Sequence, residues 1–139
     1  MLGVIAFMTT AFSFIATQED PWKVPEKYQH LKNPVVADEA SLNSGLEIFT
    51  TYCAPCHGKD GKGDGIRSTK LPTPPADFTS EIFQNQSDGS LLYKIYSGHR
   101  DMPGFSKKIP GGKDALSGGF GKTRMPGDLI NYVRNFYKN

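Results

Sequence analysis

The sequence predicts an all-α fold of three to five helices joined by long Gly- and Pro-rich loops. Three observations support this prediction. Apolar residues recur at helical spacing in residues 39–52, in residues 88–97 and from Pro126 onward. The chain also has 15 glycines and 10 prolines, most of them between those segments, where they favour loops. Its 139 residues are enough for one compact domain and too few for two.

The first helix is predicted over residues 39–52, with Asp38 as its N-cap because a carboxylate can accept a hydrogen bond from the free N–H groups of a first turn. The expected buried face has the spacing i, i+4, i+7 and consists of Leu42, Leu46 and Phe49. Gly45 lies within this helix, where glycine costs about 1 kcal/mol relative to alanine. We therefore expect Gly45 to make a close contact with another helix.

Directly after this helix the chain reads Cys53-Ala54-Pro55-Cys56-His57, a C-x-x-C-H motif. Two thiols at this spacing can each add across one vinyl group of a haem, and the histidine that follows can bind the iron. The motif predicts one covalently attached haem c, with Cys53, Cys56 and His57 as its site residues. A bound macrocycle would also supply part of the core of a chain that is only 37% hydrophobic.

Other interpretations of the motif fit the sequence less well. A structural zinc site usually needs four ligands from two close pairs, whereas the remaining histidines, His30 and His99, form no second pair. A thioredoxin-like redox pair needs strands alternating with helices around it, but here a helical segment precedes the motif and a glycine-rich loop follows. A disulfide across two intervening residues of a helical turn has poor geometry. A chance match without haem stays open, because short motifs give false positives.

The segment after the motif is mostly loop up to the second helix. Residues 58–65 read GKDGKGDG, which lacks the pattern of a phosphate-binding loop. Prolines in residues 71–78 predict a stiff extended stretch. The second helix is expected over residues 88–97, capped by Ser87 and ended by Gly98, with three apolar residues facing inward: Leu91, Leu92 and Ile95.

Two loops and one helix complete the expected domain. Residues 98–105 read GHRDMPGF, and residues 106–123 are predicted as a surface loop because they show little regular pattern. The last helix begins near Pro126, a favourable first residue. Its apolar stripe has the spacing i, i+3, i+4, i+7: Leu129, Tyr132, Val133 and Phe136.

The N-terminal part divides into a leader and an extension. Residues 1–17 contain an apolar run from Leu2 to Ala16 that is too short for a convincing transmembrane helix. We expect it to be a secretory signal peptide, or else a membrane-associated leader, although no basic residue precedes it. Residues 18–37, rich in proline and aromatic residues, form an extension expected to be irregular and to pack aromatic side chains against the domain at residues 38–139.

Charge is distributed unevenly along the chain. Seven basic and eleven acidic residues precede Lys94, whereas nine basic and three acidic residues follow from Lys94 onward. This asymmetry favours a positive surface that attracts an acidic partner, unless the basic residues only form a solvated loop surface. We do not expect nucleic-acid binding, because the sequence has no recognised motif and no dense basic run.

With these motifs in order, the chain resembles a class I (mitochondrial-type) monohaem c-type cytochrome over roughly residues 38–137. The resemblance implies a cytochrome c fold in which the first and last helices cross at Gly45, Phe49 and Tyr132. It also implies that a carbonyl of the proline segment accepts a hydrogen bond from His57, with Pro72, Pro74 and Pro75 as the candidates. The extension and the long 106–123 loop depart from the family, as partner-binding additions or as spacers.

The family places its sixth iron ligand where this chain has Met102, so the resemblance implies His57 and Met102 as the metal ligands. Met125 also precedes a proline but stands at the start of the last helix, and methionine is in any case a common core residue. Met125, His99 or an open sixth position stay open as alternatives.

The implied function is electron transfer between respiratory redox partners, without enzymatic activity, in the periplasm or on the outer face of the cytoplasmic membrane. The expected partners are a respiratory complex or terminal oxidase with an acidic docking surface, and membrane association would run through the N-terminal segment. Two alternatives are a non-diffusing cytochrome subunit of a respiratory complex and a haem enzyme or gas-binding protein with an open sixth site.

Overall fold

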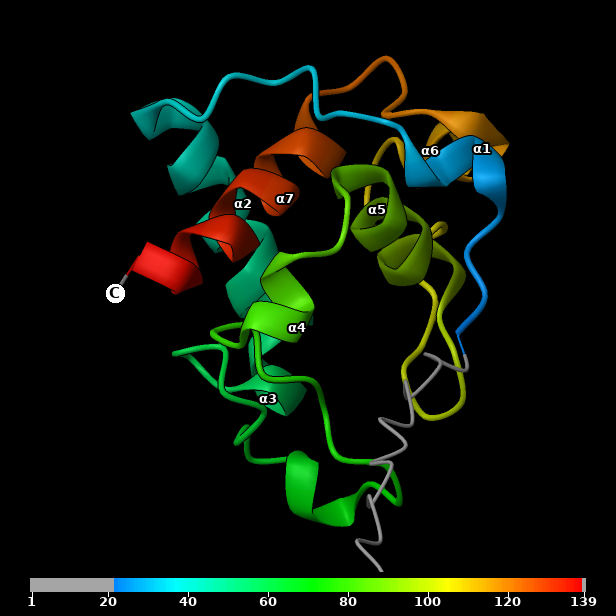
Figure 1. The fold of residues 1–139 in the computed structure, drawn as a ribbon. Helices are drawn as coiled ribbons and strands as arrows, with labels where there is room; N and C mark the ends of the chain where they lie inside the picture. The colour runs from blue at the N-terminus through cyan, green and yellow to red at the C-terminus, as the bar shows by residue number, and fades with distance from the viewer. Residues whose placement is uncertain (1–21, 139) are drawn as a thin grey trace, which may run out of the picture.

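The computed structural model describes residues 22–138, and the fold within this range is all-α (Figure 1). The described chain contains seven α-helices and two 3-10 helices: α1 (Glu26–Gln29), α2 (Glu39–Tyr52), α3 (Ala54–His57), η1 (Ser68–Lys70), α4 (Glu81–Gln84), α5 (Asp88–Ser97), α6 (Gly112–Gly118), α7 (Met125–Asn135) and η2 (Phe136–Lys138). The predicted fold class is confirmed. The predicted count of three to five helices is wrong, because several one- and two-turn helices carry too few residues to show an apolar period. The leader predicted at residues 1–17 lies outside the described residues.

Helix α2 has the predicted bounds, but its buried face differs from the predicted one. The Asp38 carboxylate accepts a hydrogen bond from the Ser41 N–H at 2.8 Å, as expected of an N-cap. Leu46 is 43% exposed. The buried residues of α2 instead follow the contact line with α7: Ser41, Gly45, Ile48 and Phe49. The prediction was wrong about Leu46 because it followed the leucines instead of the small residues that allow close helix packing.

Helices α2 and α7 cross at Gly45, as the resemblance implied (Figure 1). A Cβ atom on Gly45 would lie 2.3 Å from the carbonyl oxygen of Asp128 and 2.6 Å from Cβ of Tyr132. The rings of Phe49 and Tyr132 pack with centroids 5.2 Å apart. The buried hydroxyl of Ser41 donates a hydrogen bond to the Asp128 carboxylate at 2.7 Å. Backbone contact at this crossing requires a residue without a side chain.

We therefore expect Gly45→Ala to destabilise the protein by about 1–3 kcal/mol, the usual cost of overpacking a tight contact. The gain in helix propensity of about 1 kcal/mol does not offset a clash with backbone atoms, which cannot rotate away. Thermal unfolding of the holoprotein measures this loss as a lower Tm. Gly119→Ala is the matched control, since nothing lies within 4 Å of a Cβ built there. An unchanged Tm for Gly45→Ala would contradict the close crossing.

Helices α5 and α7 also follow the sequence prediction. The Ser87 hydroxyl caps α5 by accepting from the Ser90 N–H at 3.1 Å, and Leu91 and Leu92 are buried while Ile95 is half-buried. Helix α7 begins one residue before Pro126, which occupies its first turn. In α7, Leu129 and Val133 are buried and Tyr132 is half-buried against the core, as is Phe136 at the start of η2.

The extension and the segment 106–123 are both more regular than predicted, and they pack on each other. Helix α1 lies beside α6 in Figure 1, and both contact α5. The Tyr28 hydroxyl, on a side chain only 1% exposed, donates a hydrogen bond of 2.5 Å to the carbonyl oxygen of Leu116. The prediction of a surface loop at 106–123 was wrong. Helix α6 has no side-chain cap and begins after Gly111 in a left-handed conformation, so the sequence carries no start signal for it.

The core lies where α2, α5 and α7 meet, and it includes Cys53 from the haem-binding motif. Of the helices formed by residues 22–138, none has the length and apolar character needed to cross a membrane.

Candidate haem site

The C-x-x-C-H motif forms its own short helix, α3, directly at the end of α2. Cys53 is both the C-cap of α2 and the N-cap of α3, and its N–H donates to the Phe49 carbonyl at 2.8 Å. The N–H of His57 donates to the Cys53 carbonyl at 2.9 Å. Pro55 occupies the first turn of α3, where its missing N–H costs no helical hydrogen bond. One turn of helix therefore presents both thiols and the imidazole from a rigid base.

The glycine-rich loop after α3 folds back under this helix and binds its carbonyl groups. The N–H groups of Gly63 and Gly65 donate to the carbonyls of His57 and Cys56 at 2.8 and 3.1 Å. A Cβ on Gly65 would lie 2.5 Å from the carbonyl oxygen of Pro55. The loop thus satisfies the free carbonyls that end a helix, and its glycines permit the close approach.

The imidazole of His57 is oriented by a backbone carbonyl, although not one of the predicted prolines. Its Nδ1 atom lies 3.1 Å from the carbonyl oxygen of Ala76. The prediction that Pro72, Pro74 or Pro75 supplies the acceptor is wrong, because the acceptor is the next residue after Pro75. The Pro75 carbonyl points at Gly63 instead, since a Cβ there would lie 2.5 Å from that oxygen. A carbonyl only accepts, so Nδ1 carries the proton and Nε2 is left as the metal-binding nitrogen.

Burial also favours the neutral imidazole that metals bind. His57 is 8% exposed, and its ring stacks on Phe78 with centroids 4.3 Å apart. Burial is the largest cause that lowers the pKa of His57, and the hydrogen bond to Ala76 partly opposes it. The direction is consistent with a histidine that acts as a ligand instead of a surface cation.

The two cysteines are free thiols, and no disulfide joins them. Cys53 is buried and Cys56 half-buried. Burial, with a smaller contribution from Cys56, raises the pKa of the Cys53 thiol to about 12. Before it reacts with haem, the Cys53 sulfur is therefore a neutral thiol at pH 7.

The two candidate methionines lie in different surroundings. Met102 lies in the loop between α5 and α6, where it is half-buried and packs against the core cluster that contains Cys53. Met125 is the first residue of α7 and is 38% exposed. Met102 is therefore the less exposed of the two candidates.

Two buried polar atoms have no hydrogen-bond partner among the described residues: the hydroxyl of Tyr96 in α5 and Nε2 of His99 in the loop that follows. Tyr96, in the last turn of α5, lies close enough to Cys53 that the sulfur affects its ionisation. Burial, the larger cause, and this interaction together raise the pKa of the phenol. Unpartnered buried polar groups are rare and call for an explanation. A haem with its own polar substituents, lying against α3 and the end of α5, fits these residues. The sequence had given no sign of Tyr96.

A family model described as cytochrome c oxidase, cbb3-type, subunit III matches residues 40–115, more than half of the chain. The chain is also 30% identical over 83 residues to the cbb3-type cytochrome c oxidase subunit FixP of Azorhizobium caulinodans. That alignment covers 60% of this chain but only 24% of the relative, so this chain corresponds to about a quarter of that protein's length.

Two solved structures are similar to this chain. A chain of the reducing HAO-like protein complex of Kuenenia stuttgartiensis aligns with a TM-score of 0.58 at 24% identity, covering 74% of this chain and 46% of that one. A c-type cytochrome aligns with a TM-score of 0.49 at 22% identity, covering 66% of this chain and 95% of that one. The first likeness shows the fold alone.

The matched family segment contains the whole of α3, and the chain has a single C-x-x-C-H motif. The chain belongs to the family of the cbb3-type cytochrome c oxidase subunit III, and it is a monohaem c-type cytochrome with a covalently attached haem c.

Proposed function

We propose that this chain transfers single electrons between respiratory redox partners and has no enzymatic activity of its own. The observation that carries the proposal is the His57 imidazole, buried on α3 with Nδ1 bonded to Ala76 and Nε2 left for a metal. When bound, haem c supplies an iron that alternates between ferric and ferrous states. In this proposal Cys53 and Cys56 would hold the macrocycle, and His57 and Met102 would bind its iron.

The residues around the site would keep the two oxidation states alike in structure. Ala76 fixes the orientation of the His57 ring, and Phe78 stacks on its face. A thioether from Met102 would close the sixth position, leave no place for substrate, and favour the ferrous state relative to a second imidazole. This closed arrangement distinguishes a carrier from a haem enzyme or a gas-binding protein.

A ferric and a ferrous absorption spectrum with a redox titration of the purified holoprotein tests this proposal. We expect a low-spin ferric spectrum and one reversible one-electron step. A high-spin ferric spectrum that changes when small ligands are added would contradict it and favour chemistry at an open site.

The family membership favours a second candidate, in which this electron-transfer domain works as a fixed subunit of a membrane-bound oxidase. Both candidates place the domain in the periplasm or on the outer face of the cytoplasmic membrane. Fractionation of cells expressing the full chain separates them. Recovery of the haem protein with the membranes, together with oxidase activity, supports a subunit, and recovery in the periplasmic fraction supports a diffusing carrier.

The docking surface in this proposal is basic and lies beside the haem-attachment helix. Lys107 and Lys108 are exposed. The Tyr52 hydroxyl, one residue before Cys53, donates to the Lys108 carbonyl at 3.3 Å, and the Lys108 ammonium lies 5.7 Å from the centroid of the Phe105 ring. These contacts place Lys108 near the C-terminal end of α2, and α2 leads directly into α3. Arg124 contributes less free charge, because it lies 3.6 Å from the carboxylates of Asp38 and Asp128.

We expect electron transfer to the native acceptor to slow as salt rises, and reversal of both charges in Lys107→Glu/Lys108→Glu to slow it about tenfold at low salt. Such charges act mainly on the association rate and are screened over about 8 Å at physiological ionic strength. Stopped-flow kinetics measures the rate, while the haem spectrum stays unchanged. The control is Lys27→Glu/Lys32→Glu, which makes the same change in net charge on the extension. If the rate of electron transfer changes neither with salt nor with the double charge reversal, the partner docks through apolar contacts or is permanently assembled with this chain.

A further inference from the structure

The loop that carries Met102 is a tight turn closed by two backbone hydrogen bonds between Met102 and His99. Each donates its backbone N–H to the other's carbonyl, at 2.9 Å from His99 and 3.0 Å from Met102. Gly98 has a φ of 70°, and a Cβ on it would lie 2.7 Å from the Met102 carbonyl oxygen. Arg100, inside the turn, has a φ of 50°. Because the turn is closed by this pair of hydrogen bonds, a contact that fixes His99 also fixes the backbone of Met102.

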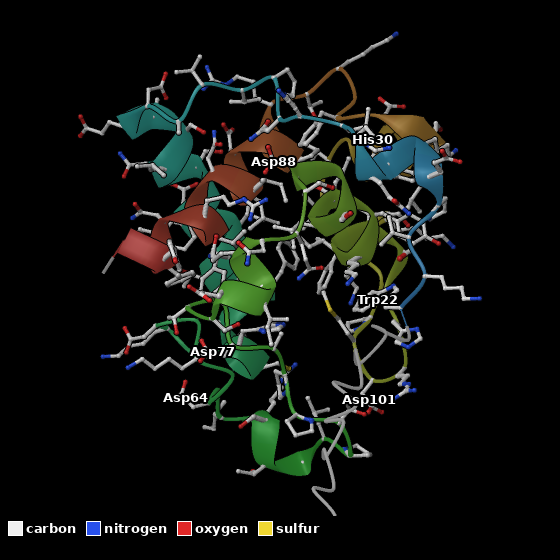
Figure 2. All side chains as sticks on the ribbon, viewed as in Figure 1. Trp22, His30, Asp64, Asp77, Asp88 and Asp101 are labelled. Atoms are coloured by element: carbon white, nitrogen blue, oxygen red, sulfur yellow. The ribbon has the colours of Figure 1, made fainter. Side chains whose placement is uncertain are left out.

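The contact that fixes His99 comes from the extension. The indole of Trp22 stacks on the His99 ring with centroids 4.9 Å apart and planes inclined by 25°. The Nε2 atom of His99 is buried and has no hydrogen-bond partner among the described residues, so no such bond from Nε2 to them holds the ring. Figure 2 shows Trp22 beside the end of α5, near the loop that carries Asp101.

Trp22 is itself anchored to α5. The Lys94 ammonium lies 5.5 Å from the centroid of the indole and donates a 2.7 Å hydrogen bond to the side-chain oxygen of Gln86. Further along the extension, the buried Tyr28 bonds to Leu116, and the Gly89 N–H donates to the Leu31 carbonyl at 3.1 Å. The extension therefore has a fixed position on the helix from which the Met102 loop emerges.

We propose that Trp22 is a positioning residue for Met102: through its stack on His99 it holds the 98–104 turn closed, so that the extension sets how firmly the sixth ligand is kept. This inference rests on the proposed role of Met102. The extension lies outside residues 40–115, the segment that the family model matches.

Added imidazole measures how often the turn opens. It can bind ferric iron only when Met102 leaves, so its apparent affinity scales with the open fraction. We expect Trp22→Ala to bind imidazole about tenfold more tightly than the wild type, since the lost stack no longer favours the closed turn. Trp22→Phe keeps an aromatic face and should restore most of the difference. Hydrogen exchange of the His99 and Met102 amides in the ferrous holoprotein should quicken in Trp22→Ala.

Asn33→Ala is the matched control within the same extension. Asn33 donates to the Gly127 carbonyl and to the Asn131 side chain, both at 2.8 Å, and neither group belongs to the turn. This variant should lower Tm and leave imidazole affinity unchanged. Equal imidazole affinity in Trp22→Ala and the wild type would overturn the positioning role.

A separate result would overturn the proposed function alone. If the wild type lacks the sulfur-to-iron charge-transfer band, Met102 is not the ligand. Hydrogen exchange of the His99 and Met102 amides then tests whether Trp22 keeps the turn closed. Faster exchange in Trp22→Ala supports this role, and unchanged exchange overturns it.

Discussion

Replacing both Cys53 and Cys56 with alanine is expected to abolish retention of haem by the denatured protein, whereas the wild type keeps one haem per chain. Thioether bonds survive denaturation, but axial coordination by His57 does not. Each single variant loses one of the two bonds and should weaken or abolish the stable holoprotein. Mass spectrometry of the denatured chains and extraction into acidic organic solvent measure the effect.

Pro55→Ala is the control for this experiment, because it alters the segment between the thiols and removes neither sulfur. It should retain its haem after denaturation. If haem extracts freely from the wild type, the attachment is not covalent and the roles of both cysteines are wrong.

Met102→Ala should open the sixth position of the iron. We expect a shift of the ferric spectrum from low to high spin and loss of the sulfur-to-iron charge-transfer band. The reduction potential should fall by on the order of 0.1–0.3 V, part of the roughly 0.8 V over which axial ligands set haem potentials. Optical spectroscopy and a redox titration give all three results.

Two further variants identify the ligand. Met125→Leu should leave the band intact, and the reverse pattern would move the ligand to Met125. If Met102→Ala stays low-spin, the half-buried His99 in the same turn is the most direct replacement, and Met102→Ala/His99→Ala should then become high-spin.

Elements with local signals could be predicted from the sequence, and elements stabilised by tertiary contacts could not. Helices α2 and α5 each carry a side-chain cap, and their expected bounds match the structure. Helix α6 has only seven residues and no capping side chain, and Ala115 at its centre is fully buried by its neighbours. Leu46 was misplaced because the period of an apolar stripe does not say where the partner helix will approach.

The same division holds for the site. Cys53, Cys56 and His57 are contiguous, so one turn of helix is enough to bring them together. The acceptor for His57 depends on how single peptide units are oriented: the Ala76 carbonyl lies at the His57 ring, whereas the Pro75 carbonyl lies beside Gly63. The stack of Trp22 on His99 joins residues far apart in sequence. The unique tryptophan of the chain was a visible signal, but its partner was not.

The hydrogen bond between Tyr28 and Leu116 has an evolutionary consequence. Tyr28 is almost fully buried, and its hydroxyl satisfies the Leu116 carbonyl of α6. A lineage that lost α6 would leave the buried Tyr28 hydroxyl without this acceptor, and one that lost the extension would leave the Leu116 carbonyl without this donor. The two segments are therefore expected to be gained and lost together, so that the chain lengths before α2 and before α7 vary in step among homologues.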